Sequence, residues 1–186
     1  MSISNGGGDL AEKLKPAVLT LRMILFALAS GVVTFGGFVI WMQMNGKLDQ
    51  ADEAGQSMTL IALGFAPVAL VASRIVPSLM VRNARRQIAA GTFQLSRNVA
   101  AFLSELGDVG KLFSIHQTKT IVSGAILEGA AFLGVIAYMF GGSLIVLGMS
   151  VLLVGAILIL FPSVPSVMEW IEEQMRLIEE EKNLAR

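Results

Sequence analysis

The sequence predicts an all-α polytopic membrane protein with four transmembrane helices arranged as two hairpins. Of its 186 residues, 54% are hydrophobic and only 15% are charged, whereas a soluble domain carries about 25% charged residues. The shortage of charge is concentrated in windows that each have about the 20 residues that a helix needs to cross a bilayer. These windows are residues 23–46, 54–73, 120–140 and 142–161.

The distribution of positive charge predicts the orientation. Basic residues precede the first window, and the loop after it is acidic, with Asp49, Asp52 and Glu53. Between the second and third windows, seven Lys and Arg residues face only two acidic ones. Because short loops rich in Lys and Arg stay in the cytoplasm, we expect both termini and the central segment there. The apolar run of the first window is too long for the core of a cleaved signal peptide.

The windows divide the chain into five regions. The tip Gly141-Gly142-Ser143 is so short that the third and fourth spans must form a tight antiparallel hairpin. Arginines mixed with apolar residues over Val81–Leu106 predict a connector of one or two amphipathic helices. The expected regions are a disordered tail (1–15), a first transmembrane hairpin (16–76), a cytoplasmic amphipathic connector (77–118), a second transmembrane hairpin (119–162) and a cytoplasmic acidic helix (163–186).

The C-terminal region predicts an amphipathic helix with a defined start. Ser166 and Glu169 have the spacing of a capping box, and Glu172 precedes Arg176 by four residues, as in a helical ion pair. Six glutamates in this region disfavour an anionic membrane surface, so we expect the helix to dock on the basic connector or on a partner protein. Its apolar stripe consists of Val167, Ile171, Met175 and Ile178.

Composition excludes several functional classes. The chain has no cysteine and a single histidine, His116, so thiolate metal sites, cysteine nucleophiles and multi-histidine sites within one chain are ruled out. A net charge of zero gives no indication of nucleic-acid binding. We find no acid–base pair, metal cluster or phosphate-binding loop, and expect His116 to be a surface residue near the headgroups. The sequence therefore predicts a protein that is not an enzyme and has no catalytic residue, metal or cofactor.

Glu128 is the most informative residue, because it is the only charged one between Lys119 and Glu169. A carboxylate inside the bilayer costs on the order of 3 kcal/mol or more unless it is protonated, paired or turned to the protein interior. One hypothesis is structural, with a protonated Glu128 bonded to Ser30, Thr34 or a backbone carbonyl and fixing helix register. The other is binding of a proton or cation. We favour the structural hypothesis, because the spans supply few polar groups for a pathway.

An offset of 98 residues aligns the first span with the third and indicates an internal repeat. Glycines 31 and 36 fall on glycines 129 and 134, and Ser30 falls on Glu128. Small residues let membrane helices approach closely, so we expect the first and third spans to meet with Ser30 and Glu128 at similar depth. The candidate helix-packing residues are Gly31, Gly36, Gly129 and Gly134.

The segment Ala125–Ala131 resembles the A-x-x-E-G-A-A motif in the third helix of a family of uncharacterised bacterial four-span membrane proteins. These proteins share the short hairpin tip and a proline-serine ending such as Pro162-Ser163. The resemblance covers most of the third and fourth spans, and implies the fold and a bacterial inner-membrane location. Glu128 followed by small residues is also similar to the membrane carboxylate of rotary ATP synthase c subunits, which carry protons.

Together these features predict a non-enzymatic protein of a bacterial inner membrane, acting as an accessory or structural subunit of a membrane assembly. Its expected partners are the lipid bilayer and either further copies of itself or other membrane subunits. The alternative function is an oligomeric proton- or cation-translocating protein that uses Glu128.

Overall fold

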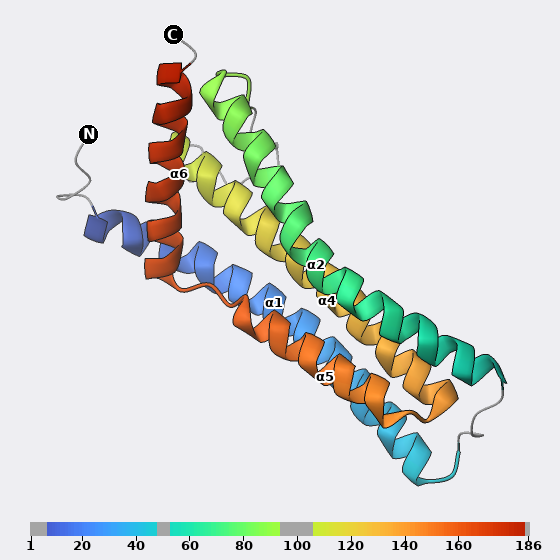
Figure 1. Cartoon of the computed structure of the whole chain (residues 1–186). Coiled ribbons are helices and arrows are strands. Elements are labelled where there is room, and N and C mark those ends of the chain that lie inside the picture. Colours follow the sequence, from blue (N-terminus) through green and yellow to red (C-terminus); the bar gives the residue numbers. More distant parts are fainter. Residues whose placement is uncertain (1–6, 48–52, 94–105, 185–186) are drawn as a thin grey trace. The chain divides into compact units, whose positions relative to one another are not determined.

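The structure is a computed structural model that describes residues 7–47, 53–93 and 106–184. These residues form helices and contain no strand, which confirms the all-α class. The helices are α1 (Gly7–Met44), α2 (Glu53–Ala89), α4 (Asp108–Gly141), α5 (Leu144–Ile159) and α6 (Val164–Leu184) (Figure 1).

The predicted membrane windows lie in α1, α2, α4 and α5. Among the described residues, α1, α2 and α4 are each long and apolar enough to cross a membrane. Helix α5 has 16 residues and meets the same test only when it is taken with α6 as one broken span. The described part therefore has three helices that are long and apolar enough to cross a membrane, or four spans when α5 and α6 are counted together.

The helix ends differ from two of the predicted region boundaries. Helix α1 begins at Gly7, so residues 7–15 of the expected disordered tail are helical. Helix α2 continues to Ala89 without a break at residue 76, so residues 77–89 of the expected connector belong to the same helix as the second window. The charges after residue 76 end the apolar window but not the helix, because Arg, Ala and Gln are good helix formers. Residues 94–105 of the connector lie outside the described residues.

The chain divides into two compact units. The spanning unit comprises Met23–Val76 and Ile121–Phe161. The terminal unit comprises Met1–Arg22, Pro77–Thr120 and Pro162–Arg186. Helices α1, α2 and α4 each contribute to both units, so the core of each unit is described separately.

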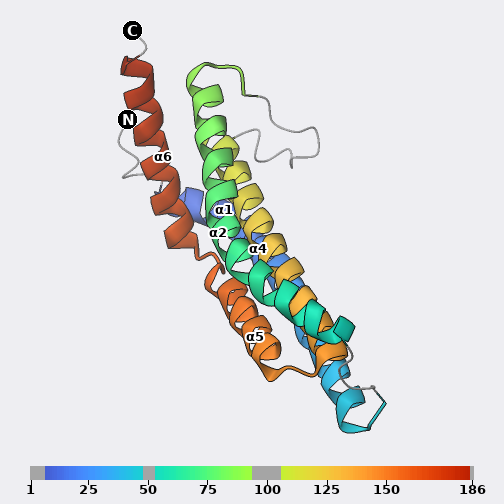
Figure 2. The same cartoon turned by 45° about the vertical axis from the view of Figure 1, so that its right-hand side comes forward.

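In the spanning unit, α4 contacts α1, α2 and α5, and both views show it running beside them (Figure 1, Figure 2). Half of its most apolar window is buried, compared with 28% in α1 and 22% in α2. Its contacts are made at glycines. A Cβ atom at Gly124 would lie 3.0 Å from Leu25 of α1, one at Gly134 would meet Ser150 of α5, and Gly141 approaches the backbone of α2.

The α2 contact of α4 also includes polar and backbone groups. Ser123 Oγ donates a hydrogen bond to the backbone oxygen of Ser73 at 2.9 Å, and both side chains are buried. Near the hairpin tip, a Cβ at Gly55 would lie 2.5 Å from the backbone oxygen of Phe140. Alanines of α2 complete the packed face, since Ala62, Ala66 and Ala69 are all buried.

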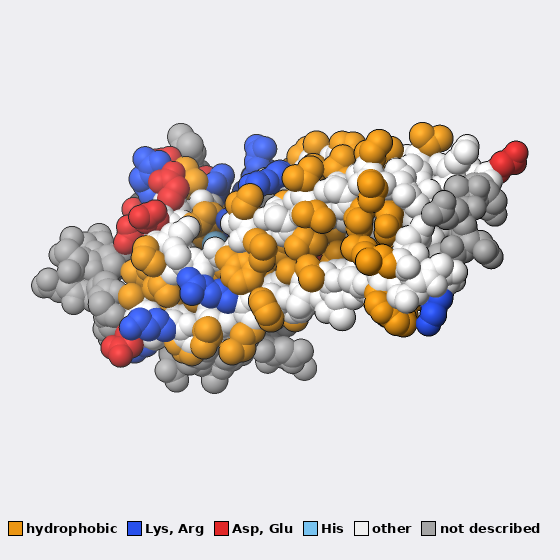
Figure 3. Space-filling model, turned by 90° about the horizontal axis from the view of Figure 1, so that it is seen from below, with side chains coloured by type: hydrophobic (Ala, Val, Ile, Leu, Met, Phe, Trp, Pro, Cys, Tyr) orange, Lys and Arg blue, Asp and Glu red, His pale blue; other side chains and the backbone are white. Residues whose placement is uncertain are grey.

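The outer face of the spanning unit is apolar, as a lipid-facing surface should be. Figure 3 shows apolar side chains gathered over the long helices on one face of the molecule. The most exposed large apolar residues of this unit are distributed over several helices and include Met23, Phe26, Val33, Leu60, Val68, Leu144, Ile145, Leu152 and Ile159.

The predicted tight hairpin between α4 and α5 is present. Helix α4 ends at Gly141, and the N–H of Gly142 donates to the backbone oxygen of Tyr138 at 2.8 Å. Gly142 has a φ of +62°, a conformation that glycine adopts without steric cost. Ser143 then stands in extended conformation before the first residue of α5.

The terminal unit has its own hydrophobic core, to which all of its helical segments contribute. Of the predicted apolar stripe of α6, Val167, Ile171 and Ile178 are buried and Met175 is partly buried. They pack with Leu14 and Val18 of α1, Ile88 of α2, and Leu112, Phe113 and Ile115 of α4. Arg85 Nε of α2 also lies 2.8 Å from Glu181 Oε1 of α6. The predicted docking of the acidic helix on the basic segment therefore occurs within the chain.

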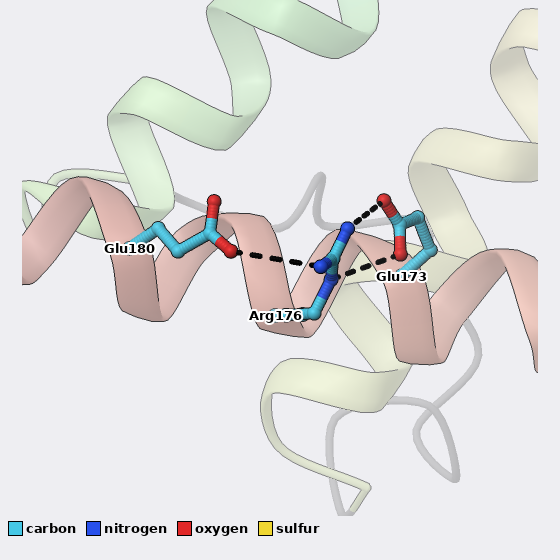
Figure 4. A network of polar contacts seen from close by, with 3 residues as sticks. All are labelled: Glu173, Arg176 and Glu180. Atoms are coloured by element: carbon cyan, nitrogen blue, oxygen red, sulfur yellow. Dashed lines mark hydrogen bonds and ion pairs between the residues drawn. The ribbon is translucent and has the colours of Figure 1, made fainter.

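Two local predictions for α6 are wrong. The helix begins at Val164, and the hydroxyl of Ser163, rather than of Ser166, caps it by accepting a bond from the Ser166 N–H at 3.2 Å. Arg176 pairs with Glu173 at 2.7 Å and approaches Glu180 at 3.8 Å, instead of pairing with Glu172 (Figure 4). Glu173 and Glu180 lie three residues before and four residues after Arg176, and their carboxylates are the ones that contact its guanidinium group.

The α2–α4 approach predicts unequal effects of the same substitution on one helix. Gly55→Ala should lower the free energy of unfolding by about 1–3 kcal/mol, because the new methyl group meets backbone that cannot rotate away. Gly64→Ala is the matched control, since a Cβ there has nothing within 4 Å and gains up to about 1 kcal/mol of helix propensity. Thermal unfolding in detergent measures both, and equal stabilities would contradict the packing described.

The terminal unit predicts that apolar burial, rather than the ion pair, holds α6 in place. Ile171→Ala should cost about 2–5 kcal/mol, because the side chain is 2% exposed. Glu181→Gln should cost less than about 1 kcal/mol, because its partly exposed pair with Arg85 is screened by solvent. Trp170 fluorescence during unfolding, in a Trp41→Phe background, reports on α6. A larger loss for Glu181→Gln than for Ile171→Ala would refute this ranking.

Candidate functional site

Glu128 lies on α4 where this helix meets α1 in the spanning unit. A Cβ atom at Gly31 of α1 would lie 3.8 Å from Glu128 Oε1 and 3.6 Å from Phe132. Phe132 packs against Phe35 of α1, with 5.7 Å between ring centroids. The carboxyl group therefore sits beside the α1 backbone, at the depth of Gly31.

A shallow groove runs along α1 next to this carboxyl group. The groove is open to the outside of the unit, and its only polar side chains are two hydroxyls, Ser30 and Thr34. Thr34 is exposed, whereas Ser30 and Glu128 are partly buried. We call this surface the Glu128 groove; its lining residues are Ala27, Ser30, Gly31, Thr34, Phe35, Phe38 and Phe132.

The predicted hydrogen bonds of Glu128 to Ser30 and Thr34 do not form within the chain. Ser30 Oγ donates instead to the backbone oxygen of Ala27 at 3.0 Å. Within the described part of the chain, neither the Glu128 carboxyl nor the Thr34 hydroxyl makes a hydrogen bond. The structure thus brings Ser30 and Thr34 into one groove with Glu128 beside it, and the carboxyl group has no hydrogen-bond partner among the described residues.

The candidate packing glycines behave differently from one another. Gly31 and Gly36 of α1 lie against Phe132 and Val135 of α4, as the repeat predicts. Gly134 packs against α5 rather than α1. Gly129 is exposed, and a Cβ there would have nothing within 4 Å. It therefore makes no close helix contact among the described residues and leaves open space beside Glu128.

Sequence reasoning missed three glycines that do make close contacts, Gly55, Gly124 and Gly141. The repeat does not identify the two on α4, because the residues 98 positions earlier are Phe26 and Gln43. Gly141 could have been identified from its place at the end of a predicted membrane helix, next to a short hairpin tip. A glycine there permits close approach of two helix backbones.

A second cluster of polar and aromatic side chains lies in the terminal unit, and it corrects the prediction for His116. This histidine is 8% exposed rather than on the surface. Its ring packs edge-on against Trp170 of α6, with centroids 5.0 Å apart. Lys119 Nζ lies 4.3 Å from the centroid of the same Trp170 ring, a cation–π arrangement. Trp170 therefore joins α6 to α4.

Buried polar atoms accompany this cluster. His116 Nδ1 and Gln174 Oε1 are buried and have no hydrogen-bond partner in the described part of the chain. Trp170 and Gln174 are four residues apart on α6, so they share one helix face. The described residues contain no group of three or more His, Cys, Asp or Glu side chains that could hold a metal ion.

Comparison of the chain with protein-family models, with curated proteins and with solved structures found no match. The resemblance to the bacterial four-span family and to the c subunits therefore stays a prediction from the motif around Glu128.

The geometry predicts that Glu128 contributes nothing to the stability of the isolated chain. Glu128→Leu should change the free energy of unfolding by less than about 0.5 kcal/mol, because no internal hydrogen bond is lost. Ser123→Ala should cost about 0.6–1.7 kcal/mol, because its buried bond to Ser73 is lost. Unfolding of the monomer dispersed in detergent compares the two variants. A larger loss of unfolding free energy for Glu128→Leu would show that Glu128 fixes the helix register within the chain.

Proposed function

We propose that this protein is a non-enzymatic integral membrane protein that serves as an accessory or structural subunit of a membrane assembly. The observation that carries the proposal is the outward-facing Glu128 groove in the spanning unit. Its carboxyl group has no hydrogen-bond partner within the described chain. A group of this kind is satisfied by association with another membrane helix.

Two physical arguments support an assembly role. An ionisable group at bilayer depth is costly when it faces lipid, so such groups face protein or a water-filled cavity. Membrane helices associate through small residues and side-chain hydrogen bonds, because lipid supplies no hydrophobic driving force between them. The groove supplies Ala27 and Gly31 as small residues and Ser30 and Thr34 as polar ones, and the Glu128 carboxyl lies beside it.

The charges support an orientation with the terminal unit in the cytoplasm of a bacterium. Lys and Arg residues flank the predicted spans on the side of this unit, and positive charge marks the cytoplasmic side. Helix α6 also presents exposed glutamates, including Glu172, Glu173, Glu179 and Glu180. This acidic surface is suited to contact basic segments of other subunits.

A second candidate function is proton or cation translocation by an oligomer. The outward position of Glu128 favours it, because a carboxyl group without an internal bond can exchange a proton as its surroundings change. The groove offers only the Ser30 and Thr34 hydroxyls beside the carboxyl. This small set of polar groups supports an assembly contact better than a pathway across the membrane.

The two functions differ in ion flux. We expect proteoliposomes containing the wild-type protein to show no proton or cation flux above that of protein-free vesicles. Glu128→Gln is the matched variant, because the amide keeps the shape of the side chain and cannot ionise. Flux in the wild type that disappears in folded Glu128→Gln would contradict the assembly role and establish translocation.

A further inference from the structure

We propose that the occupant of the Glu128 groove is a second copy of this chain, related by a two-fold axis along the membrane normal. In this dimer the carboxyl group of Glu128 in each copy bonds to the hydroxyls of Thr34 and Ser30 in the other. The inference deepens the proposed function, on which it rests, by naming the partner of the groove.

Depth in the membrane is the first argument. Copies of one chain insert with the same orientation, so a closed two-fold pair has its axis along the membrane normal. Rotation about such an axis leaves the depth of each residue in the membrane unchanged, so each residue meets residues of the other copy that lie at the same depth. Glu128 lies level with Gly31, and Ser30 and Thr34 lie within a turn of Gly31 on the same groove. The second copy therefore presents its hydroxyls at the depth of the carboxyl group.

Hydrogen-bonding chemistry is the second argument. A protonated carboxyl group has one donor and further acceptor capacity, and a hydroxyl can both donate and accept. Thr34 has both functions available. Ser30 donates to Ala27 within its own helix but can still accept. Each copy thus carries both halves of a reciprocal contact, as a two-fold interface requires.

Shape is the third argument. Small side chains, Ala27 and Gly31, lie on the groove, and Ala125 and Gly129 are exposed on α4 beside Glu128. They allow two backbones to approach closely enough for short side chains to bond. Phe38, which is 53% exposed, closes one end of the groove and gives the contact an apolar margin.

Another groove on the spanning unit provides a comparison. It lies between α1 and α5, and its lining includes Val32, Gly36, Val151 and Val154. Its one hydroxyl, Ser150, already donates to the backbone oxygen of Val146, so lipid chains can cover this groove. Of these two grooves, the Glu128 groove is the one with a carboxyl group beside it that has no hydrogen-bond partner among the described residues.

The absence of native cysteine makes the test direct. Single cysteines at Ala27 and Phe38 bracket the groove and leave Ser30, Thr34 and Glu128 unchanged. The full chain is placed in lipid vesicles at low protein density and treated with a short bismaleimide. Leu60→Cys on α2 and Val151→Cys on α5 are the controls, since these side chains are 72% and 65% exposed on other surfaces.

We expect cross-linked dimers of twice the 19.8 kDa chain mass from the Ala27 or Phe38 cysteine, well above those from the controls. Adding Glu128→Leu should weaken dimerisation at least about tenfold, because the hydrogen bonds of both carboxyl groups are lost. Glu128→Leu in an otherwise wild-type chain, followed by gel filtration, verifies that the variant is folded.

Other outcomes overturn the inference in distinguishable ways. Equal cross-linking from groove and control cysteines, or dimers unaffected by Glu128→Leu, would exclude a dimer through Glu128. Cross-linking of the groove to a different polypeptide in native membranes, with no dimer in vesicles, would also overturn it while leaving the assembly role intact. Flux dependent on Glu128 would overturn the assembly role itself, whatever the cross-linking shows.

Discussion

The close approach of α4 to three neighbouring helices is the constraint on which the spanning unit depends. Gly124, Gly134 and Gly141 bring its backbone against α1, α5 and α2 respectively. Inside a membrane, helix association relies on van der Waals packing and a few hydrogen bonds. Glycine provides the first by removing side-chain bulk, and the buried bond from Ser123 to Ser73 adds the second.

This packing decides where Glu128 can lie. The glycines commit three sides of α4 to its neighbours, and the remaining stripe carries Ala125 and Gly129, both exposed. Glu128 adjoins that stripe at the edge of the α1 contact. The carboxyl group is therefore partly exposed at the edge of the contact between α1 and α4.

Much of the fold was predictable from composition, because a helix that crosses a bilayer needs an apolar window of about 20 residues. Helix ends were less predictable. Residues 77–89 look like a separate connector by charge, yet they continue α2, since helix propensity and burial of Ile88 outweigh the change in polarity. The burial of His116 also could not be read from the sequence, because it depends on Trp170 arriving from a distant segment.

The candidate site was predictable in its members but not in its bonding. A lone acid in an apolar window identifies Glu128, and the repeat places Ser30 near it. The repeat cannot indicate that Ser30 donates to Ala27 within its own helix. Hydrogen-bond direction depends on side-chain rotamers, which hydropathy and spacing do not encode.

The most direct test of this account is the reaction of Glu128 with a hydrophobic carbodiimide, which modifies protonated carboxyl groups that it reaches from an apolar phase. Mass spectrometry would locate the adduct in chains dispersed as monomers in detergent and in chains assembled in lipid. The account predicts modification of Glu128 in the monomer and protection in lipid. A monomer in which Glu128 does not react would contradict the outward position of the carboxyl group.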